Sequence, residues 1–291
     1  MTTQPALFLS HGAPDLALAD SPAHRFLREL GTWLERPDAI VIASAHHEGA
    51  GPLVRAPERF TTWHDFGNFD RRLFALRYEP PGVPALADEV LASLRTAGLP
   101  AASDPAALID HGAWVPLSLL FPGADIPVAM VSIDPARDAA WHARIGEALA
   151  PLRKRNILVI GSGSISHNLR AVFSARPGED RRWVDGFTTW LADRVAAGDR
   201  EALLATMATA PDAARNHPTD EHLLPFFVAM GAGGEGAAGT RLHHSYTYDV
   251  LAMDAYAFGE AETLAPLAAL QSGIHDIGID EAEARMVEHL G

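Results

Sequence analysis

The sequence predicts one layered α/β domain, in which a central, mainly parallel or mixed sheet is flanked by helices. Three apolar runs carry this prediction, at residues 5–10 (PALFLS), 38–45 (DAIVIASA) and 156–163 (NILVIGSG), and each is typical of a strand buried on both faces. Segments with helical periodicity lie between them, an alternation that favours a layered sheet. No long linker divides the chain, so we expect one domain over residues 1–258 and an acidic C-terminal extension over 259–291.

The remaining elements follow from periodicity and from turn residues. Helices are expected where apolar residues recur at spacings of three and four, over residues 24–34, 84–97, 137–152, 181–197 and 200–209. A further helix is expected from Thr219 as its N-cap, which places His222 at the third helical position. Strands are expected over residues 73–78, 126–133 and, as one or two strands, 241–258, and loops over 48–70, rich in aromatic residues, and 231–239, rich in glycine and alanine.

Composition excludes several classes of protein. Lys and Arg number 23 against 37 Asp and Glu, and the resulting net charge of −14 repels nucleic acid and anionic lipid. No apolar stretch is long enough to span a membrane, and the N-terminus lacks the pattern of a signal peptide, so we expect a cytoplasmic protein. The absence of cysteine excludes disulfides, thiolate nucleophiles and thiolate metal ligands, and leaves 14 histidines for metal or proton chemistry.

Histidines follow each of the three buried strands. His11 follows the first, His46 and His47 follow the second, and His167 follows the third. Polar side chains at such strand ends are held by a rigid element and remain accessible from the adjoining loop. Adjacent residues on extended backbone point in opposite directions, so only one of His46 and His47 can enter a shared site, and periodicity alone does not choose between them. Glu48 is expected on the same side of the strand as His46. Three roles are open to it: a metal ligand, a carboxylate that orients a ligand, or an exposed surface charge.

Two further histidines occur in distinctive contexts. His111 stands in the turn DHG before Trp114, and His222 stands in HPTDEH, where the expected helix N-terminus lowers the pKa of the ring and keeps it neutral. A set of histidines without cysteine fits an iron, zinc or copper site better than a serine hydrolase. Ser162 and Ser164 lie in GSGS, which is neither the G-x-S-x-G turn of a hydrolase nor a phosphate-binding loop.

Six motifs together resemble the class III extradiol ring-cleavage dioxygenases, in the branch that contains the 4,5-DOPA dioxygenases. They are LSHGAP, IASAHHE, DHGAWVPL, GSGSISHNL, HPTDEHLLP and DVLAMDAYAF, in this order over roughly residues 5–258. The resemblance implies that residues 1–258 form a catalytic domain of this type. It implies a mononuclear non-haem Fe(II) centre, with Zn(II) often found in purified protein, and a role in the catabolism of aromatic compounds. The family is often dimeric, which makes a homodimer the assembly to test.

Residue roles follow from the same resemblance. His11, His46 and His222 match the three metal ligands, His167 matches the acid–base histidine and His111 matches a histidine beside the substrate. The family usually has tryptophan where this chain has His47. Three protein ligands on one face of an octahedral iron leave three positions, enough for both oxygens of a catecholic substrate and for O₂.

The predicted function is therefore an Fe(II)-dependent extradiol dioxygenase that opens a catecholic ring with O₂. An imidazole can accept and donate protons near neutral pH, which suits the acid–base role expected for His167. Two alternatives use the same fold and histidines, namely a zinc-dependent hydrolase, which needs no O₂, and a metal-binding protein without enzymatic activity.

Overall fold

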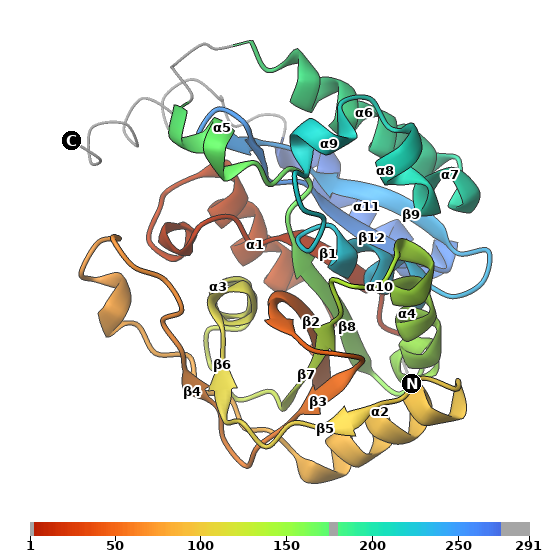
Figure 1. The fold of residues 1–291 in the computed structure, drawn as a ribbon. Helices are drawn as coiled ribbons and strands as arrows, with labels where there is room; N and C mark the ends of the chain where they lie inside the picture. The colour runs from red at the N-terminus through yellow and green to blue at the C-terminus, as the bar shows by residue number, and fades with distance from the viewer. Residues whose placement is uncertain (1–2, 175–179, 275–291) are drawn as a thin grey trace.

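An eight-stranded mixed sheet runs through the protein, with helices on both of its faces (Figure 1). The structure is a computed structural model that describes residues 3–174 and 180–274. The strands follow the order β5-β3-β7-β2-β8-β1-β12-β9 across the sheet. Their bounds are β1 Ala6–Ser10, β2 Ala39–Glu48, β3 Leu53–Arg55, β5 Ala102–Ser103, β7 Val128–Ile133, β8 Ile157–Gly163, β9 Ala238–His243 and β12 Ala255–Gly259. Two short pairs lie outside this sheet, β4 (Thr61–Thr62) with β6 (Leu108–Ile109) and β10 (Tyr246–Thr247) with β11 (Leu251–Ala252).

The centre of the sheet is parallel. β7, β2, β8 and β1 are parallel neighbours, whereas β12 is antiparallel to β1, and β3 is antiparallel to β7. The α/β prediction is therefore confirmed, and so are the three buried strands on which it rests. Because parallel strands end at the same edge, the C-terminal ends of β1, β2 and β8 lie together there.

Two hydrophobic cores lie on the opposite faces of the sheet. The helices are α1 Pro22–Trp33, α2 Pro84–Thr96, α3 His111–Leu120, α4 Ala139–Arg153, α5 Leu169–Ser174, α6 Arg182–Ala196, α7 Arg200–Leu204, α8 Thr206–Thr209, α9 Ala213–Asn216, α10 Leu224–Ala232 and α11 Ala261–Ile274, with the 3₁₀ turns η1 Pro14–Ala17 and η2 Leu73–Ala75. Buried side chains of α2, α4, α6 and α10 pack on one face, and those of α1, α3 and α11 pack on the other. Figure 1 shows the helices around the sheet. Alternate residues of β2 serve the two cores, with Val41 on the first side and Ile40 and Ile42 on the second.

Three expectations about local structure are wrong. Residues 73–78 form no strand, because the backbone bonds there are local: Leu76 N–H donates to the Leu73 carbonyl within η2 and the turn that follows it. The helix expected over residues 200–209 is two short helices, α7 and α8. The loop expected over residues 231–239 is shorter, because α10 continues to Ala232 and β9 begins at Ala238.

The helix expected to follow Thr219 as its N-cap begins four residues later than expected, at Leu224, with Leu223 at the N-cap position. Pro225 occupies its first turn, the position where a residue without an N–H group costs least. His222 therefore lies in the turn before α10 and not at its third position. His111, expected in a turn, is the first residue of α3, and the Asp110 side chain caps that helix by accepting from the Ala113 N–H.

The start of the predicted extension packs against the domain. Leu264 and Leu267 of α11 are buried in the same core as α1. The rest of that extension, residues 275–291, lies outside the described residues. Across the described ranges, no helix has both the length and the apolar character that a membrane crossing requires.

Candidate metal centre

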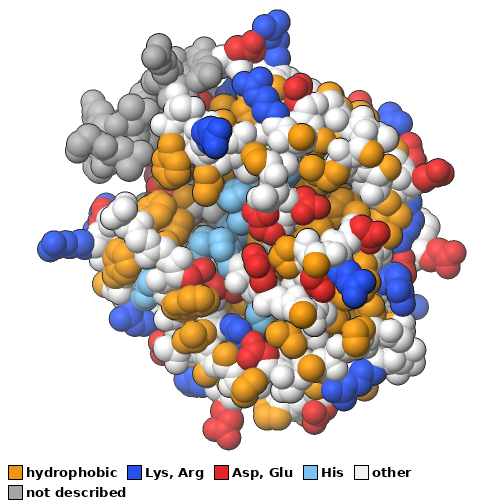
Figure 2. All heavy atoms as spheres, in the orientation of Figure 1, with side chains coloured by type: hydrophobic (Ala, Val, Ile, Leu, Met, Phe, Trp, Pro, Cys, Tyr) orange, Lys and Arg blue, Asp and Glu red, His pale blue; other side chains and the backbone are white. Residues whose placement is uncertain are grey.

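Histidine side chains gather in a hollow at the C-terminal edge of the central strands. His11 follows β1, His46 lies near the end of β2, and His167 follows β8. Figure 2 shows histidine side chains clustered in a depression of this face, with acidic and hydrophobic side chains around them. The sheet therefore brings together residues that are up to 156 positions apart in the sequence.

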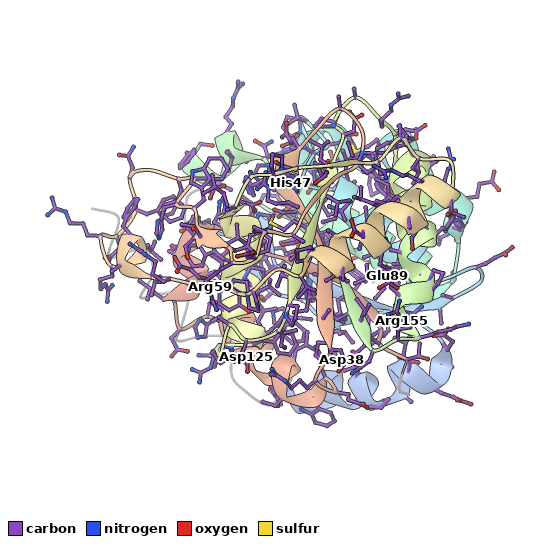
Figure 3. The ribbon with its side chains drawn as sticks, turned by 90° about the horizontal axis from the view of Figure 1, so that it is seen from below. Asp38, His47, Arg59, Glu89, Asp125 and Arg155 are labelled. Atoms are coloured by element: carbon purple, nitrogen blue, oxygen red, sulfur yellow. The ribbon has the colours of Figure 1, made fainter. Side chains whose placement is uncertain are left out.

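An irregularity in β2 separates His46 from His47. Pairing with β7 is regular up to Ser44, opposite Ser132, and resumes only at Glu48, opposite Ile133. Such a bulge re-aims side chains at the end of a strand. Figure 3 labels Asp38 just before β2 and His47 near its other end. His47 is buried away from the cluster, with its Nε2 3.2 Å from Asp104 Oδ2, while Glu48 is exposed.

His11, His46 and His222 converge on one point. The Nε2 atom of His46 lies 3.2 Å from Nε2 of His11 and 3.3 Å from Nε2 of His222, and one ring nitrogen of each residue lies within 4.8 Å of the others. Two nitrogens bound to one metal ion at about 2.1 Å, with an angle of about 90–110°, are roughly 3.0–3.4 Å apart. The observed spacings therefore fit a common metal ion.

Hydrogen bonds on the far side of two rings fix where their protons lie. The Ser162 hydroxyl donates its only hydrogen to the Gly112 carbonyl, so at 3.1 Å it accepts from the Nδ1–H of His11. Nδ1 of His222 lies 3.1 Å from Glu221 Oε1, which as a carboxylate only accepts. Nε2 of both rings is therefore unprotonated and presents a lone pair to the cluster. Converging lone pairs repel one another unless a cation lies between them, which is the arrangement of a metal site.

Burial keeps these rings neutral. It lowers the pKa of His11 well below the ordinary value, and the neighbouring His46 lowers it further. Burial also strongly lowers the pKa of His46. It lowers the pKa of His222 to about 4, although the nearby Glu221 carboxylate raises the pKa of this ring. The cause is desolvation, not the helix dipole expected from the sequence, because His222 precedes α10. Neutral imidazole is the form that binds metals.

His111 and His167 flank this cluster on different sides. The His111 ring lies 4.0 Å from that of His46, measured between ring centroids. The His167 ring stacks on His222, with centroids 3.4 Å apart, and its Nδ1 lies 3.6 Å from Glu221 Oε1. Contacts with His167 and His222 hold the pKa of Glu221 well below its usual range. Five of the six histidines singled out in the sequence therefore lie in one site, and His47 lies outside it.

Three residues that contact these rings were not predicted from the sequence, namely Ser162, Glu221 and Asp65. Ser162 was considered only for a hydrolase turn or a phosphate-binding loop, and Glu221 appeared only as part of the HPTDEH motif. Asp65 lies in the aromatic loop, where its side chain meets His46 and His111. Glu221 directly precedes a candidate ligand and Asp65 directly follows a histidine, which are weak signals. Nothing in the sequence pairs Ser162 with His11.

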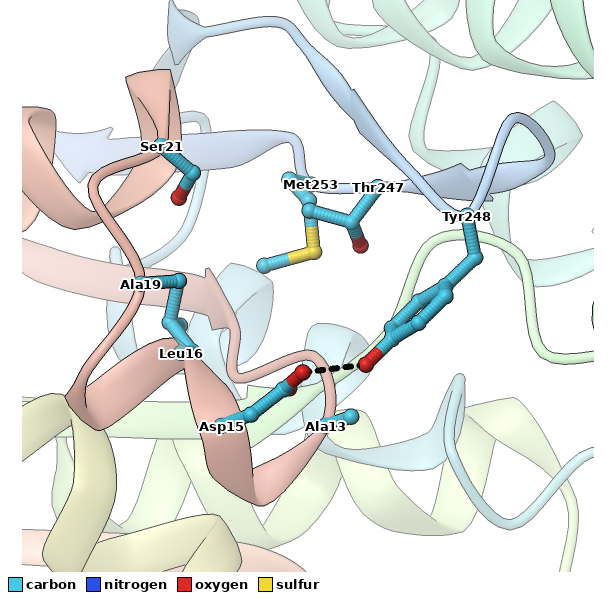
Figure 4. Close-up of a pocket in the computed structure, with 8 residues that line it drawn as sticks. All are labelled: Ala13, Asp15, Leu16, Ala19, Ser21, Thr247, Tyr248 and Met253. Carbon is cyan, nitrogen blue, oxygen red and sulfur yellow. Dashed lines mark hydrogen bonds between the residues drawn. The ribbon is translucent and has the colours of Figure 1, made fainter. Parts of the chain in front are cut away.

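A small pocket lies beside the turn that follows His11 (Figure 4). The Tyr248 hydroxyl donates to the Asp15 carboxylate there, and the Met253 side chain contacts Gly12. Tyr248 and Asp249 both have positive φ, of 51° and 59°, as in a tight turn between two antiparallel strands. The hairpin of β10 and β11 therefore supports the turn that carries His11.

Fold and site together define an α/β protein with a histidine cluster compatible with metal binding. Residues 5–259 match the family described as the catalytic LigB subunit of aromatic ring-opening dioxygenase. The chain belongs to this LigB family and is an extradiol aromatic ring-opening dioxygenase.

Named relatives agree with this assignment. The 4,5-DOPA dioxygenase extradiol of Beta vulgaris is 36% identical over 258 residues, which cover 86% of this chain and 95% of the relative. The protein of the same name from Escherichia coli (strain K12) is 38% identical over 234 residues, with 79% and 86% covered. The crystal structure of an uncharacterized Escherichia coli K12 protein superposes with a TM-score of 0.74 at 32% identity, and the match covers 88% of this chain and 100% of that one.

Proposed function

We propose that this protein is a non-haem Fe(II) dioxygenase that opens the ring of a catecholic substrate with O₂. His11, His46 and His222 are the proposed metal ligands. The observation that carries the proposal is the convergence of their ring nitrogens at 3.2 and 3.3 Å, with two of the rings held in the ligating tautomer. Zn(II) fits the same nitrogens and is expected in protein purified without added iron.

When bound, Fe(II) supplies the Lewis acidity that ionises a catechol hydroxyl and the redox chemistry with O₂. The protein supplies the proton transfers. His167 is half-buried and faces Glu221 through Nδ1, which leaves its Nε2 free to accept a proton from the second hydroxyl and to return it during ring opening. The Glu221 carboxylate stabilises the imidazolium that forms. His111, on the side of His46, is placed to bind the substrate.

The test is anaerobic reconstitution with Fe(II), followed by measurement of O₂ consumption with a set of catechols. The expected product is a yellow muconic semialdehyde that contains both atoms of labelled O₂. A catechol with one methylated oxygen is the control, because it loses one metal-binding oxygen and one ionisable proton and should react very poorly. Anaerobic turnover supported by zinc, with oxygen incorporated from water alone, would contradict the proposal and favour a hydrolase.

A further inference from the structure

The third ring of the cluster, His46, has its own candidate partner in the aromatic loop. Asp65 Oδ2 lies 3.8 Å from His46 Nδ1, on the opposite side of the ring from the Nε2 atom that faces His11 and His222. The carboxylate is 8% exposed. Ser162 and Glu221 contact the Nδ1 atoms of the other two rings, so a side-chain oxygen faces Nδ1 of each of the three rings.

Asp65 also contacts His111. Its Oδ1 accepts a hydrogen bond of 3.0 Å from the His111 backbone N–H, at the N-terminus of α3, where a negative charge is favoured. The same oxygen lies 3.0 Å from His111 Nδ1, without the alignment of a hydrogen bond. One carboxylate therefore faces both the proposed ligand His46 and the proposed substrate-side His111.

The loop that carries Asp65 is fixed at its base. The Tyr78 N–H donates to the Thr62 hydroxyl at 2.8 Å, and this hydroxyl donates to the Tyr78 carbonyl at 3.2 Å, which closes the loop. The Trp114 Nε1–H donates to the Trp63 carbonyl at 3.1 Å, tying the loop to α3. Phe66, next to Asp65, lies edge-on to His111 with ring centroids 5.7 Å apart. The backbone on either side of Asp65 is thus anchored, which allows a short side chain to place two rings.

We propose that Asp65 is a positioning residue: its carboxylate faces Nδ1 of His46 across 3.8 Å, favours the tautomer with the proton on that atom, and so orients the ring toward the metal, while it holds His111 beside this ring. The inference rests on the proposed function, because it assigns His46 Nε2 to the metal. Carboxylates behind ligating histidines fix the tautomer and raise the basicity of the ring, and their loss typically weakens metal binding by about 10–100-fold. Asp65 also ties the position of the aromatic loop to the metal site.

The test compares Asp65→Asn with wild type, and uses Asp70→Asn as a matched control. Asn retains the shape of Asp65 and an oxygen that accepts from the His111 N–H, but it removes the charge that faces His46. Asp70 lies in the same loop, and its carboxylate binds the guanidinium of Arg72. The readouts are Zn(II) affinity by competition with a chelator, the visible spectrum of the Co(II) form, and thermal unfolding of the metal-free protein.

We expect Asp65→Asn to bind one metal ion about 10–100-fold more weakly, with an altered Co(II) spectrum and nearly unchanged unfolding of the metal-free protein. Asp70→Asn should match wild type in all three measurements. Unchanged affinity and spectrum in Asp65→Asn would overturn the positioning role, and complete loss of binding would make Asp65 a ligand instead. If wild type itself bound no stoichiometric metal, the proposed function would fail first and the inference with it.

Discussion

Gly163, at the end of β8, should be essential to the geometry of the metal centre. Its carbonyl accepts from the His11 N–H at 3.0 Å, so it lies directly beside one proposed ligand. A Cβ atom added to Gly163 would lie 2.1 Å from the His222 carbonyl oxygen, whereas ordinary contact begins near 3.4 Å. In Gly163→Ala the His222 backbone must therefore move by about 1.3 Å, well beyond the ~0.5 Å that a metal site tolerates.

The expected result for Gly163→Ala is a loss of about 1–3 kcal/mol in the free energy of unfolding, as in other overpacked sites, and Zn(II) binding weaker by at least about tenfold. Urea unfolding of the metal-free protein and chelator-competition titration measure the two effects. Gly186→Ala in α6 is the control, because its added Cβ would meet only Pro211 Cγ at 3.9 Å and alanine favours a helix. Metal affinity in Gly163→Ala equal to that of wild type would refute the close-packing argument.

Three further predictions concern individual histidines. His46→Ala should abolish stoichiometric metal binding and His47→Ala should retain it, as measured by metal analysis after dialysis; the opposite pattern would transfer the ligand role to His47. His167→Ala should keep the metal but lower kcat by about 10²–10⁴-fold, and loss of metal in this variant would instead identify a ligand. Burial lowers the pKa of His217 to about 3. Between pH 6.5 and 3 this imidazole is therefore protonated in the unfolded chain but stays neutral in the folded protein. The metal-free protein should therefore lose stability as the pH falls from 6.5 toward 3, and His217→Gln should reduce the slope by up to about 1.4 kcal/mol per pH unit; an unchanged slope would show that this ring does not contribute.

The sequence alone determined the layered α/β architecture. Runs such as residues 38–45 and 156–163 consist almost entirely of apolar or small residues, which is typical of a strand covered on both faces. This pattern depends only on neighbouring residues, so the sequence alone is sufficient to recognise it. The same runs pointed to the site, because a histidine follows each run within four residues and parallel strands share their C-terminal edge. Five of the six histidines that were singled out meet in one place, and His47 does not.

Only the tertiary structure decided how these histidines are held. His46 faces the cluster and His47 does not, next to a bulge in β2 that depends on pairing with β7, whose partner residues are more than 80 positions away. The Ser162 partner of His11 comes from another strand, 151 residues away. The expected helix start at Thr219 failed because propensity and capping patterns compete with packing, and the chain begins α10 next to Pro225 instead. Strand composition is a local property of the sequence, whereas proton positions and ring orientations depend on contacts between distant segments, so only the folded chain could define them.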